Sequence, residues 1–235
     1  MLRTIAPIAM LLFSLNVAFS QVEDGKFFYG FKAGAILSDV SDIASTIIRP
    51  VFPVDTYSTS IVRRKGITAG FSVYHRFKDS RLAIQPEISY AIGGADFRYM
   101  DVNDLDYTID FNYQYLNISM MIKMYLTRGA FFNLGPTLGL NLTRTSLTYK
   151  SNMPELGPDL QIQQSLREVL KGKNNFSLSG GIGYDAEMGL GIEFRYNLGV
   201  VDVLETQANG FFFIENDNLS NSIQVTVTYL IPFVD

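Results

Sequence analysis

The stretch NSIQVTVTYLIPFVD, residues Asn221–Asp235, alternates apolar and polar side chains. Its apolar parity comprises Ile223, Val225, Val227, Tyr229, Ile231 and Phe233. Its polar parity comprises Ser222, Gln224, Thr226 and Thr228. A period of two predicts a β-strand with one apolar face. Because terminal segments usually fray unless a sheet holds them, we expect neighbouring strands on both edges of this one.

Seven further segments repeat this alternation. They are 26–38, 66–77, 82–94, a stretch that ends with 116–126, 130–143, 175–187 and 190–201. Long connections and tight turns alternate between them, and an even number of strands joined in this way is typical of bacterial outer-membrane barrels. The sequence therefore predicts an all-β fold, an eight-stranded antiparallel up-and-down transmembrane β-barrel with long extracellular loops and short periplasmic turns. Closing the barrel pairs the last strand with the first and leaves no free edge.

The fourth strand pattern contains a change of parity. Phe111, Tyr113 and Tyr115 share one parity, whereas the apolar residues from Leu116 onward share the other. A residue inserted into one strand of a pair has this effect on the side chains that follow it. We therefore predict a β-bulge or a register break near Leu116.

Alternation alone does not say which face of the barrel meets lipid, because a soluble lipocalin-type barrel turns its apolar face inward. Here the apolar parity carries large side chains on nearly every strand, which is too much volume for the interior of eight strands. The other parity is rich in Gly, Ser, Asn and Thr. Aromatic residues near strand ends are typical of an interfacial girdle; they are Phe27, Tyr29, Phe77, Phe132, Phe194 and Phe233. We expect the apolar face to contact lipid in the outer membrane of a bacterial cell.

The first twenty residues differ from the rest of the chain. Arg3 precedes an apolar run from Ile5 to about Leu15, and small residues follow at Ala18 and Ser20. This pattern predicts a secretory signal peptide, residues 1–20, cleaved before Gln21. A membrane anchor is the alternative, but the run is shorter than the roughly 18–20 residues that a spanning helix needs. Residues 21–235 then form the outer-membrane barrel domain.

Composition excludes several classes of site. The chain has no Cys, so it has neither disulfides nor thiolate metal ligands. Its net charge is −4 and its Lys and Arg residues are scattered, which argues against a nucleic-acid partner.

Charged residues of both signs fall on the parity that we assign to the lumen. They are Lys32, Arg76, Lys123, Arg195, Glu87, Asp185, Glu187 and Glu193. Because an unpaired buried charge is costly, we interpret them as an internal salt-bridge network. A gated pore or a proton path is the alternative, although an eight-stranded interior is normally filled by side chains.

No other group of residues predicts a catalytic, cofactor or metal site. His75 is the only histidine, and it lies on the apolar parity near the periplasmic end of its strand, so we expect it at the membrane interface. Asp101, Asp104, Asp106 and Asp110 lack the spacing of an EF-hand and are interpreted as a solvated acidic loop. The glycines of GGIG, 180–183, lie inside a strand pattern and not in a phosphate loop.

One loop segment, Pro158–Gly172, has the start and stop signals of a short amphipathic helix. Its apolar residues are Leu160, Ile162, Leu166, Val169 and Leu170. They would either cover the mouth of the barrel or contact a protein partner. With the apolar stretch Ile47–Val54, this helix is our candidate for an interaction surface. Outer-membrane lipid is the other expected partner, and the oligomeric state stays open.

Several strands resemble those of the PorT-like outer-membrane barrels of Bacteroidetes. The resemblance is carried by YGFKAGAILSDV (29–40), IQPEISYAIGGA (84–95), YLNISMMIKMYL (115–126), FFNLGPTLGLNL (131–142) and EFRYNLGVVDV (193–203). The chain departs from the family at Ser119, where Pro is common, and at its end, where Val234 and Asp235 follow Phe233. The resemblance implies a small non-enzymatic outer-membrane barrel with a structural or interaction role. The name-giving members imply an alternative, an accessory role in type IX protein secretion and gliding. An outer-membrane lipid-modifying enzyme is a third, weaker hypothesis.

Overall fold

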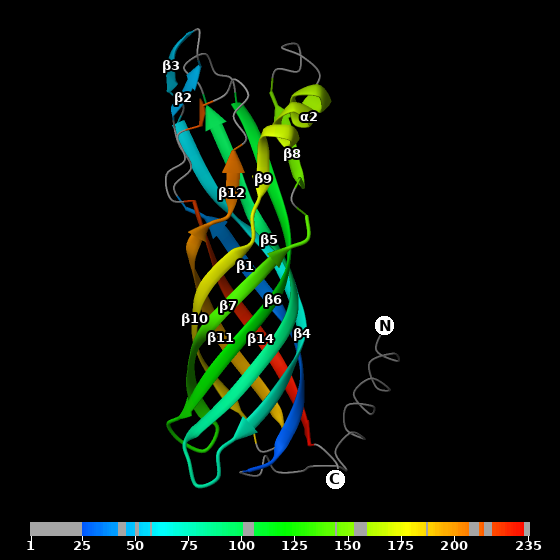
Figure 1. Ribbon diagram of the computed structural model, residues 1–235, viewed down its shortest axis with the longest axis vertical. Helices are drawn as coiled ribbons and strands as arrows, with labels where there is room; N and C mark the ends of the chain where they lie inside the picture. Colours follow the sequence, from blue (N-terminus) through cyan, green and yellow to red (C-terminus); the bar gives the residue numbers. More distant parts are fainter. Residues whose placement is uncertain are drawn as a thin grey trace, which may run out of the picture.

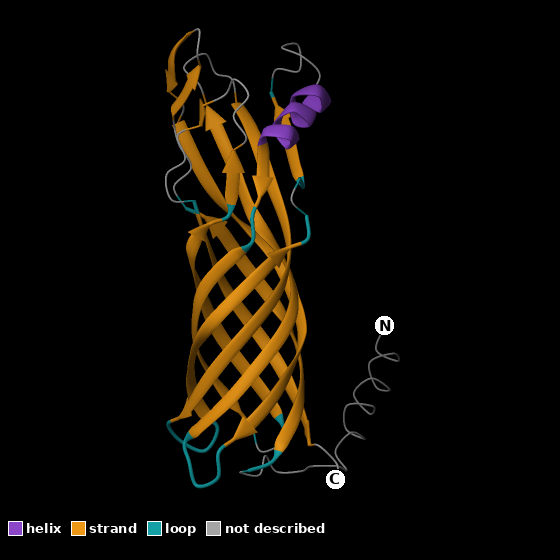
Figure 2. Cartoon of the chain, in the orientation of Figure 1, coloured by secondary structure: helices purple, strands orange, loops and turns teal. Residues whose placement is uncertain are grey.

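A computed structural model describes residues 25–41, 46–49, 52–56, 58–100, 106–143, 145–152, 159–186, 188–206, 212–213 and 218–232. In this part of the chain, eight antiparallel strands close into a tall barrel (Figures 1 and 2). They are β1 (Phe27–Val40), β4 (Ser58–Arg76), β5 (Leu82–Met100), β6 (Asp106–Tyr125), β7 (Ala130–Asn141), β10 (Asn175–Asp185), β11 (Leu190–Asp202) and β14 (Leu219–Pro232). Their order around the barrel is β1-β4-β5-β6-β7-β10-β11-β14, and β14 pairs with β1. The predicted fold is confirmed.

The last strand is held on both edges, as its alternation requires. Thr228 lies opposite Lys32 of β1 on one side, and Thr226 lies opposite Glu193 of β11 on the other. This double pairing explains why a regular strand continues almost to the end of the chain.

All tight turns lie at one end of the barrel, the lower end in Figure 1. They join β4 to β5, β6 to β7 and β10 to β11. Gly129 and Gly189 have positive φ angles of 101° and 80° in two of these turns, a conformation that glycine adopts without strain. The end with short turns is periplasmic in outer-membrane barrels, and the long connections therefore lie outside the cell.

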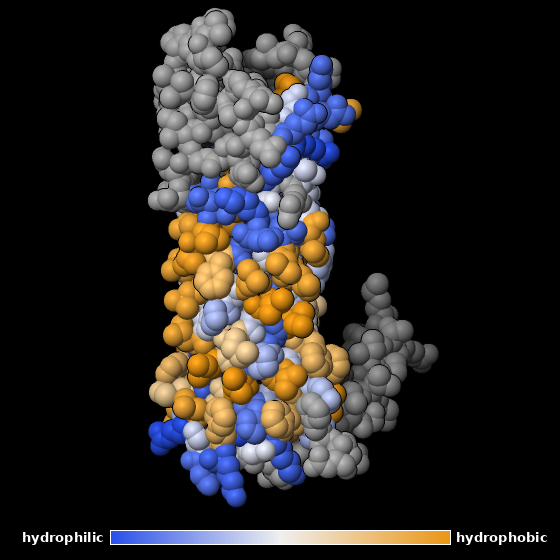
Figure 3. Space-filling model, in the orientation of Figure 1, coloured by the Kyte–Doolittle hydropathy of each residue, from blue (hydrophilic) through white to orange (hydrophobic). Residues whose placement is uncertain are grey.

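The apolar parity faces outward. On β11, Ile192 and Phe194 are 54% and 48% exposed, whereas Glu193 between them is 3% exposed. On the face seen in Figure 3, an apolar band crosses the middle of the barrel, with polar surface above and below it. A soluble barrel with an apolar interior is thereby excluded, and the outward face is the surface that lipid covers.

The extracellular connections contain more regular structure than the sequence predicts. β4, β5 and β6 are 19, 19 and 20 residues long and extend above the rest of the barrel (Figure 1). β8 (Leu147–Ser151) pairs with the upper part of β6, and β9 (Leu170–Gly172) pairs with β12 (Leu204–Thr206). A small sheet contains β2 (Thr46–Arg49), β3 (Phe52–Thr56) and β13 (Phe212–Phe213), and one helix, α2, spans Asp159–Val169. We call the upper parts of β4, β5 and β6, together with β8, α2, β9 and β12, the extracellular extension.

Among the described residues, no helix is both long enough and apolar enough to cross a membrane.

The predicted break near Leu116 occurs on one edge of β6 only. On that edge the register changes from Tyr115 opposite Asn141 of β7 to Phe111 opposite Leu147 of β8. On the other edge, β5 and β6 pair without a shift from Leu82 opposite Met124 to Met100 opposite Asp106, so β6 itself has no bulge that reverses its faces. The parity changes because the environment of the inward face changes. Tyr113 faces inward in the extracellular extension, where that face is apolar. Below the extension, the same inward face meets a polar lumen.

Two apolar clusters lie inside the barrel, one at each end of the polar lumen. The upper cluster comprises Val40, Ala95, Phe97, Ile109, Phe111, Tyr113, Tyr115, Leu147, Tyr149, Leu170, Val203 and Leu204. The lower, periplasmic cluster comprises Phe28, Tyr74, Ala83, Tyr125, Phe131 and Leu230. The charged residues predicted for the lumen, as far as the structure describes them, lie between the two clusters or beside the lower one.

Candidate functional site

The polar lumen has room for long side chains because some strands present glycine to it. A Cβ atom on Gly181 would lie 2.9 Å from Asn133 Oδ1 and 3.1 Å from Arg195 Cα. Any larger residue there would displace the side chains that cross the barrel. The glycines that the sequence places on this parity therefore allow charged groups to pack against one another.

Four charged side chains meet in the middle of the lumen: Lys32 from β1, Glu87 from β5, and Glu193 and Arg195 from β11. Lys32 Nζ is 3.0 Å from Glu87 Oε2 and 3.3 Å from Glu193 Oε2. Arg195 Nε is 2.6 Å from Glu193 Oε1, and Nη1 is 2.8 Å from Glu87 Oε2. Each cation thus contacts both carboxylates. We call these four residues the lumen quartet.

All members of the lumen quartet are buried, with exposed side-chain fractions of 2–4%. Two amides complete the shell, since Gln85 Nε2 donates to Glu87 Oε1 at 2.7 Å and Asn133 Nδ2 donates to Glu193 Oε1 at 2.9 Å. The sequence analysis did not single out Gln85 or Asn133. Their polar side chains on an otherwise apolar strand, at inward parity, are the signal that could have found them.

A second ion pair lies closer to the periplasm. Lys123 Nζ is 3.0 Å from Asp185 Oδ2, and the Tyr125 hydroxyl donates to the same oxygen at 2.6 Å. The hydroxyls of Tyr74 and Tyr125 are 2.8 Å apart. Lys123 Nζ also lies 3.9 Å from the centre of the Phe131 ring, a cation–π contact. The lower cluster therefore joins this ion pair to the aromatic rings that close the periplasmic end.

Of the remaining two predicted lumen charges, only Arg76 lies among the described residues, and it borders the second ion pair. Arg76 has its guanidinium carbon 4.7 Å above the Tyr125 ring, and its Nε donates to the Ser80 carbonyl at 3.2 Å. It belongs to the periplasmic rim. Glu187 lies outside the described residues.

Hydroxyls and amides form a chain around part of the wall above the lumen quartet. Ser179 Oγ donates its one proton to Asn197 Oδ1 at 2.6 Å. In the 2.7 Å contact between Ser179 and Thr137, the Thr137 hydroxyl is therefore the donor and Ser179 Oγ the acceptor. By the same reasoning, Ser119 donates to Thr137 at 2.9 Å. Asn197 Nδ2 continues the chain to Ser222 Oγ at 2.9 Å. This belt satisfies polar groups that would otherwise be buried without partners.

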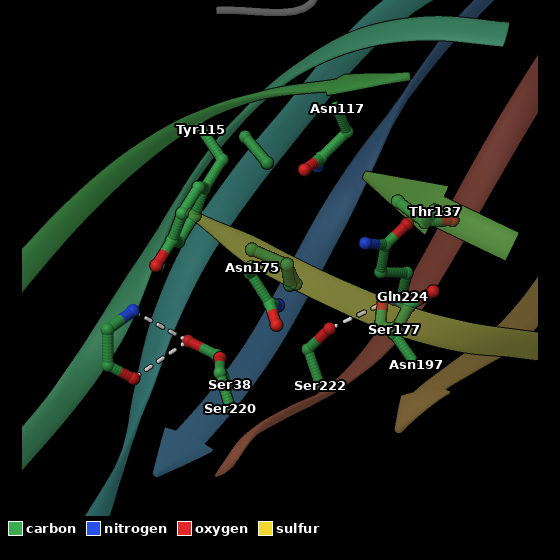
Figure 4. A pocket seen from close by; sticks show the side chains of 14 residues that line it. Ser38, Tyr115, Asn117, Thr137, Asn175, Ser177, Asn197, Ser220, Ser222 and Gln224 are labelled. Atoms are coloured by element: carbon green, nitrogen blue, oxygen red, sulfur yellow. Dashed lines mark hydrogen bonds between the residues drawn. The ribbon is translucent and has the colours of Figure 1, made fainter. Parts of the chain in front are cut away.

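A polar cavity of about 40 Å³ lies beside this belt (Figure 4). Asn117, Asn175, Ser222 and Gln224 are among the side chains that line it, and they come from three different strands. Asn175 Oδ1 has no hydrogen-bond partner among the described residues. A cavity of this volume has room for about three water molecules, to which the polar groups of its lining can hydrogen-bond.

The helix predicted in the extracellular loop is α2, but it ends at Val169, and Leu170 lies in β9. Ile162 and Leu166 contact the upper cluster, of which Leu170 is itself a member. Leu160, by contrast, is 64% exposed. The structure describes the backbone of Val169 but not its side chain.

Side chains of α2 also bond to the outer edge of β8. The Tyr149 amide donates to Gln163 Oε1 at 3.1 Å, and Arg167 Nε donates to the Leu147 carbonyl at 2.8 Å. β8 pairs with β6 on its other edge. The helix thereby occupies backbone groups that an edge strand would otherwise expose. The sequence analysis missed this contact, since it depends on a strand that was assigned to a loop.

The other residues considered in the sequence are placed as follows. His75 lies at the periplasmic end of β4, with its ring stacked on Phe27 at 4.2 Å and Nδ1 3.2 Å from the Lys26 carbonyl. Asp106 and Asp110 lie on β6, whereas 101 and 104 are outside the described residues. In the described part of the chain, no three His, Cys, Asp or Glu side chains are close enough to hold a metal ion.

Comparison with known proteins gives one family and several distant structures. A family profile described as "Outer membrane protein beta-barrel domain" matches residues 19–205. No curated protein matches the chain. Neisserial surface protein A (NspA) is 12% identical, with 86% of this chain and 96% of that chain aligned at a TM-score of 0.41. OprG of Pseudomonas aeruginosa is also 12% identical, with 89% of this chain and 95% of that chain aligned at a TM-score of 0.41. Ail, the attachment invasion locus protein of Yersinia pestis, is 8% identical, with 88% of this chain and 99% of that chain aligned at a TM-score of 0.39.

The family match extends from before β1 into β12, so it includes the lumen quartet, α2 and most of the barrel wall. The apolar band and the closed antiparallel sheet agree with that family's name. The chain therefore belongs to the outer membrane protein β-barrel domain family and is a small β-barrel of the bacterial outer membrane.

Proposed function

We propose that this protein is a non-enzymatic barrel that anchors a rigid contact surface outside the cell. The observation that supports this most strongly is the upper cluster. Ten of its twelve residues come from β5, β6, β8, β9 and β12, on the extracellular side of the polar lumen. Spanning a membrane does not require such a core. Its burial stabilises the extension, which can then present side chains such as Leu160 in a fixed arrangement.

Two properties of the lumen favour this function over transport. The lumen quartet joins opposite walls, and the lower cluster closes the periplasmic end beneath it. An ion or solute would have to break several buried charge contacts and displace aromatic rings. Outer-membrane lipid and a protein bound at the extension are accordingly the partners that we propose.

The resemblance to PorT-like barrels supports a finer assignment, which is also a proposal. The chain would then be a Bacteroidetes outer-membrane protein whose residues 1–20 are removed as a signal peptide. Sequencing the amino terminus of protein isolated from outer membranes tests the cleavage, and Gln21 is the expected first residue. An accessory role in type IX secretion or gliding is the alternative, and it predicts that deletion of the gene blocks export of surface proteins.

Photo-crosslinking in living cells tests the contact surface. A crosslinking amino acid at Leu160 should capture a defined protein, since this side chain is 64% exposed outside the membrane. The matched control is Ile182, which is equally exposed on the lipid-facing side of β10. Protein adducts at Leu160 with only lipid adducts at Ile182 would support the proposal. The absence of a specific adduct at Leu160, with lipid adducts at Ile182, would count against it.

The enzyme hypothesis has a separate test. A lipid-modifying enzyme needs a base, and His75 is the only histidine of the chain. In the structure its ring packs on Phe27 and Phe77 at the periplasmic end. We expect His75→Ala to leave the lipid composition of the outer membrane unchanged. A changed lipid A profile in this variant would contradict the non-enzymatic proposal.

A further inference from the structure

Three consecutive cations, Arg63, Arg64 and Lys65, lie on β4 where the strand leaves the apolar band. The next outward residue below Lys65 is Ile67, which is 61% exposed. From Ile67 to Phe77 the chain covers about 33 Å, and a strand tilt of about 40° reduces this to a height of about 25 Å. That height matches the apolar band of an outer-membrane barrel. Lys65 therefore lies at the level of the outer-leaflet head groups.

A β-bulge brings these cations to the outer surface. In a regular strand, successive side chains point to opposite faces, so Arg64 would point into the barrel when Lys65 points out. The pairing of β4 with β5 changes register between Arg63 and Thr68. An extra residue in one strand re-aims the side chains at that point.

The ion pairs of the two arginines place the charged ends of both side chains beside outward-facing carboxylates. Arg63 Nε is 2.9 Å from Asp39 Oδ2, and Arg64 Nη1 is 2.7 Å from Asp96 Oδ1. Asp96 faces outward, because the residues on either side of it on β5 are 0% and 1% exposed. Asp39 faces outward for the same reason on β1, where its two neighbours are 4% and 0% exposed.

Lys65 completes the group. It is exposed, and it lies directly opposite Leu37, an outward residue of β1. Among the described residues it makes no hydrogen bond or ion pair. Arg63 contacts Asp39 through Nε alone and its side chain is 59% exposed, so its terminal nitrogens remain available as donors.

We propose that Arg63, Arg64 and Lys65 bind the phosphate groups of the glycolipid that forms the outer leaflet of the outer membrane. Arg63 and Arg64 are each paired with a carboxylate, whereas Lys65 makes no ion pair among the described residues, so one positive charge is available at the height of those phosphates. Phosphate oxygens accept charge-assisted hydrogen bonds from arginine and lysine. Asp39 and Asp96 orient the two guanidinium groups, and Lys65 supplies the charge that has no protein partner. This inference concerns the lipid contact of the barrel and does not depend on the proposed function of the extension.

Native mass spectrometry of the folded, detergent-solubilised protein tests the site. The probes are diphosphoryl lipid A, the same lipid without phosphates, and phosphatidylglycerol. We expect diphosphoryl lipid A to bind more tightly than the other two. Lys65→Gln should weaken its binding about fivefold, as expected for the loss of one cation near a charged lipid surface. Lys150→Gln is the matched control, because Lys150 is an exposed cation of β8 in the extension, and it should bind like the wild type.

Three results would overturn the inference. They are unchanged affinity in Lys65→Gln, equal binding of the lipid without phosphates, and equal binding of phosphatidylglycerol, which would indicate a site for any anionic lipid. Faster gel migration without boiling shows that each variant is folded. If Lys65→Gln does not fold, Arg63→Gln replaces it with the same expected loss.

Discussion

The guanidinium of Arg195 holds the carboxylate of Glu87 across the full width of the barrel. Nη1 and Nη2 are each 2.8 Å from one carboxylate oxygen. Their strands, β11 and β5, are four positions apart in either direction around the eight-stranded sheet. One bidentate contact therefore ties opposite walls together, in a buried setting where charge contacts are strong.

Removing Arg195 should destabilise the barrel strongly. Arg195→Met leaves Glu87 and Glu193 with only Lys32 as a cationic partner, and breaking a buried charge network costs about 3 kcal/mol or more. Equilibrium urea unfolding in phosphatidylcholine vesicles, followed by tyrosine fluorescence, measures the loss. The double variant Glu87→Gln/Arg195→Met should lose less than the sum of the two single variants. A loss below about 1 kcal/mol in Arg195→Met would show that the network contributes little to stability.

The wild-type protein should conduct no steady ion current in planar lipid bilayers. Arg195→Met should also remain silent, because Tyr74, Tyr125 and Phe131 still close the lumen below the quartet. A steady current in the wild type would favour the alternative of a pore. A current that appears only in Arg195→Met would show that the quartet alone seals the lumen.

Hydrogen exchange tests the contact between α2 and β8. Gln163→Ala removes the acceptor of the Tyr149 amide. One such hydrogen bond contributes about 1 kcal/mol, so exchange in residues 147–151 should become about fivefold faster. Gln164→Ala is the matched control, since Gln164 is exposed on the same helix, and it should leave exchange unchanged. Equal rates in the two variants would contradict the capping role of the helix.

Stability of the extracellular extension should depend on pH through Asp110. Burial and the carboxylate of Asp96, directly opposite across the strands, raise the pKa of Asp110, while Arg64, Lys150 and Arg98 act in the other direction. A carboxyl group with a raised pKa binds protons more tightly in the folded state. The stability of the folded extension therefore falls as pH rises from the ordinary pKa of 3.8 through the raised pKa of Asp110. At neutral pH, where Asp110 is ionised, the whole of this destabilisation is present.

Asp110→Asn removes this repulsion. At pH 7 we expect exchange of the β5–β6 amides in the extension to slow about twofold, as expected for a like-charged cross-strand pair. At pH 3 the difference should vanish, because Asp110 is then protonated. Asp106→Asn is the control, since Asp106 lies opposite Met100 and faces no acid. Equal slowing at both pH values would show that charge is not the cause.

The barrel could be predicted because one physical signal repeats in every strand. Each strand has lipid on its outer face and a narrow polar lumen on its inner face, so apolar and polar residues alternate along it. Ile192, Glu193 and Phe194 show this alternation as clearly as the last strand does. The extension could not be predicted in the same way. Above the membrane the inner face becomes apolar, so the apolar parity of β6 changes at Tyr115 although its pairing with β5 is regular, whereas the register shift of β4 between Arg63 and Thr68 leaves no such signal.

The lumen charges could be predicted as a set but not as a geometry. Parity places Lys32, Glu87 and Arg195 inside the barrel, whereas the choice of partners depends on the stagger of strands that are distant in sequence. Arg76 has the same parity but lies too near the periplasmic turn to reach the lumen quartet. The edge contacts of α2 had no sequence signal, since Gln163 and Arg167 are ordinary surface residues of a helix.

Collision accessibility of spin labels tests the central claim, that the bulky apolar face meets lipid. Labels replace Ile182, Ile192 and Val227 on the barrel, and Arg98 and Lys150 on the extension, in protein reconstituted into vesicles. The account predicts that the first three labels collide more with oxygen, which dissolves in lipid, than with a water-soluble nickel complex. The last two should show the reverse. Preferential collision of the nickel complex at Ile182, Ile192 and Val227 would contradict the assignment of this face to lipid.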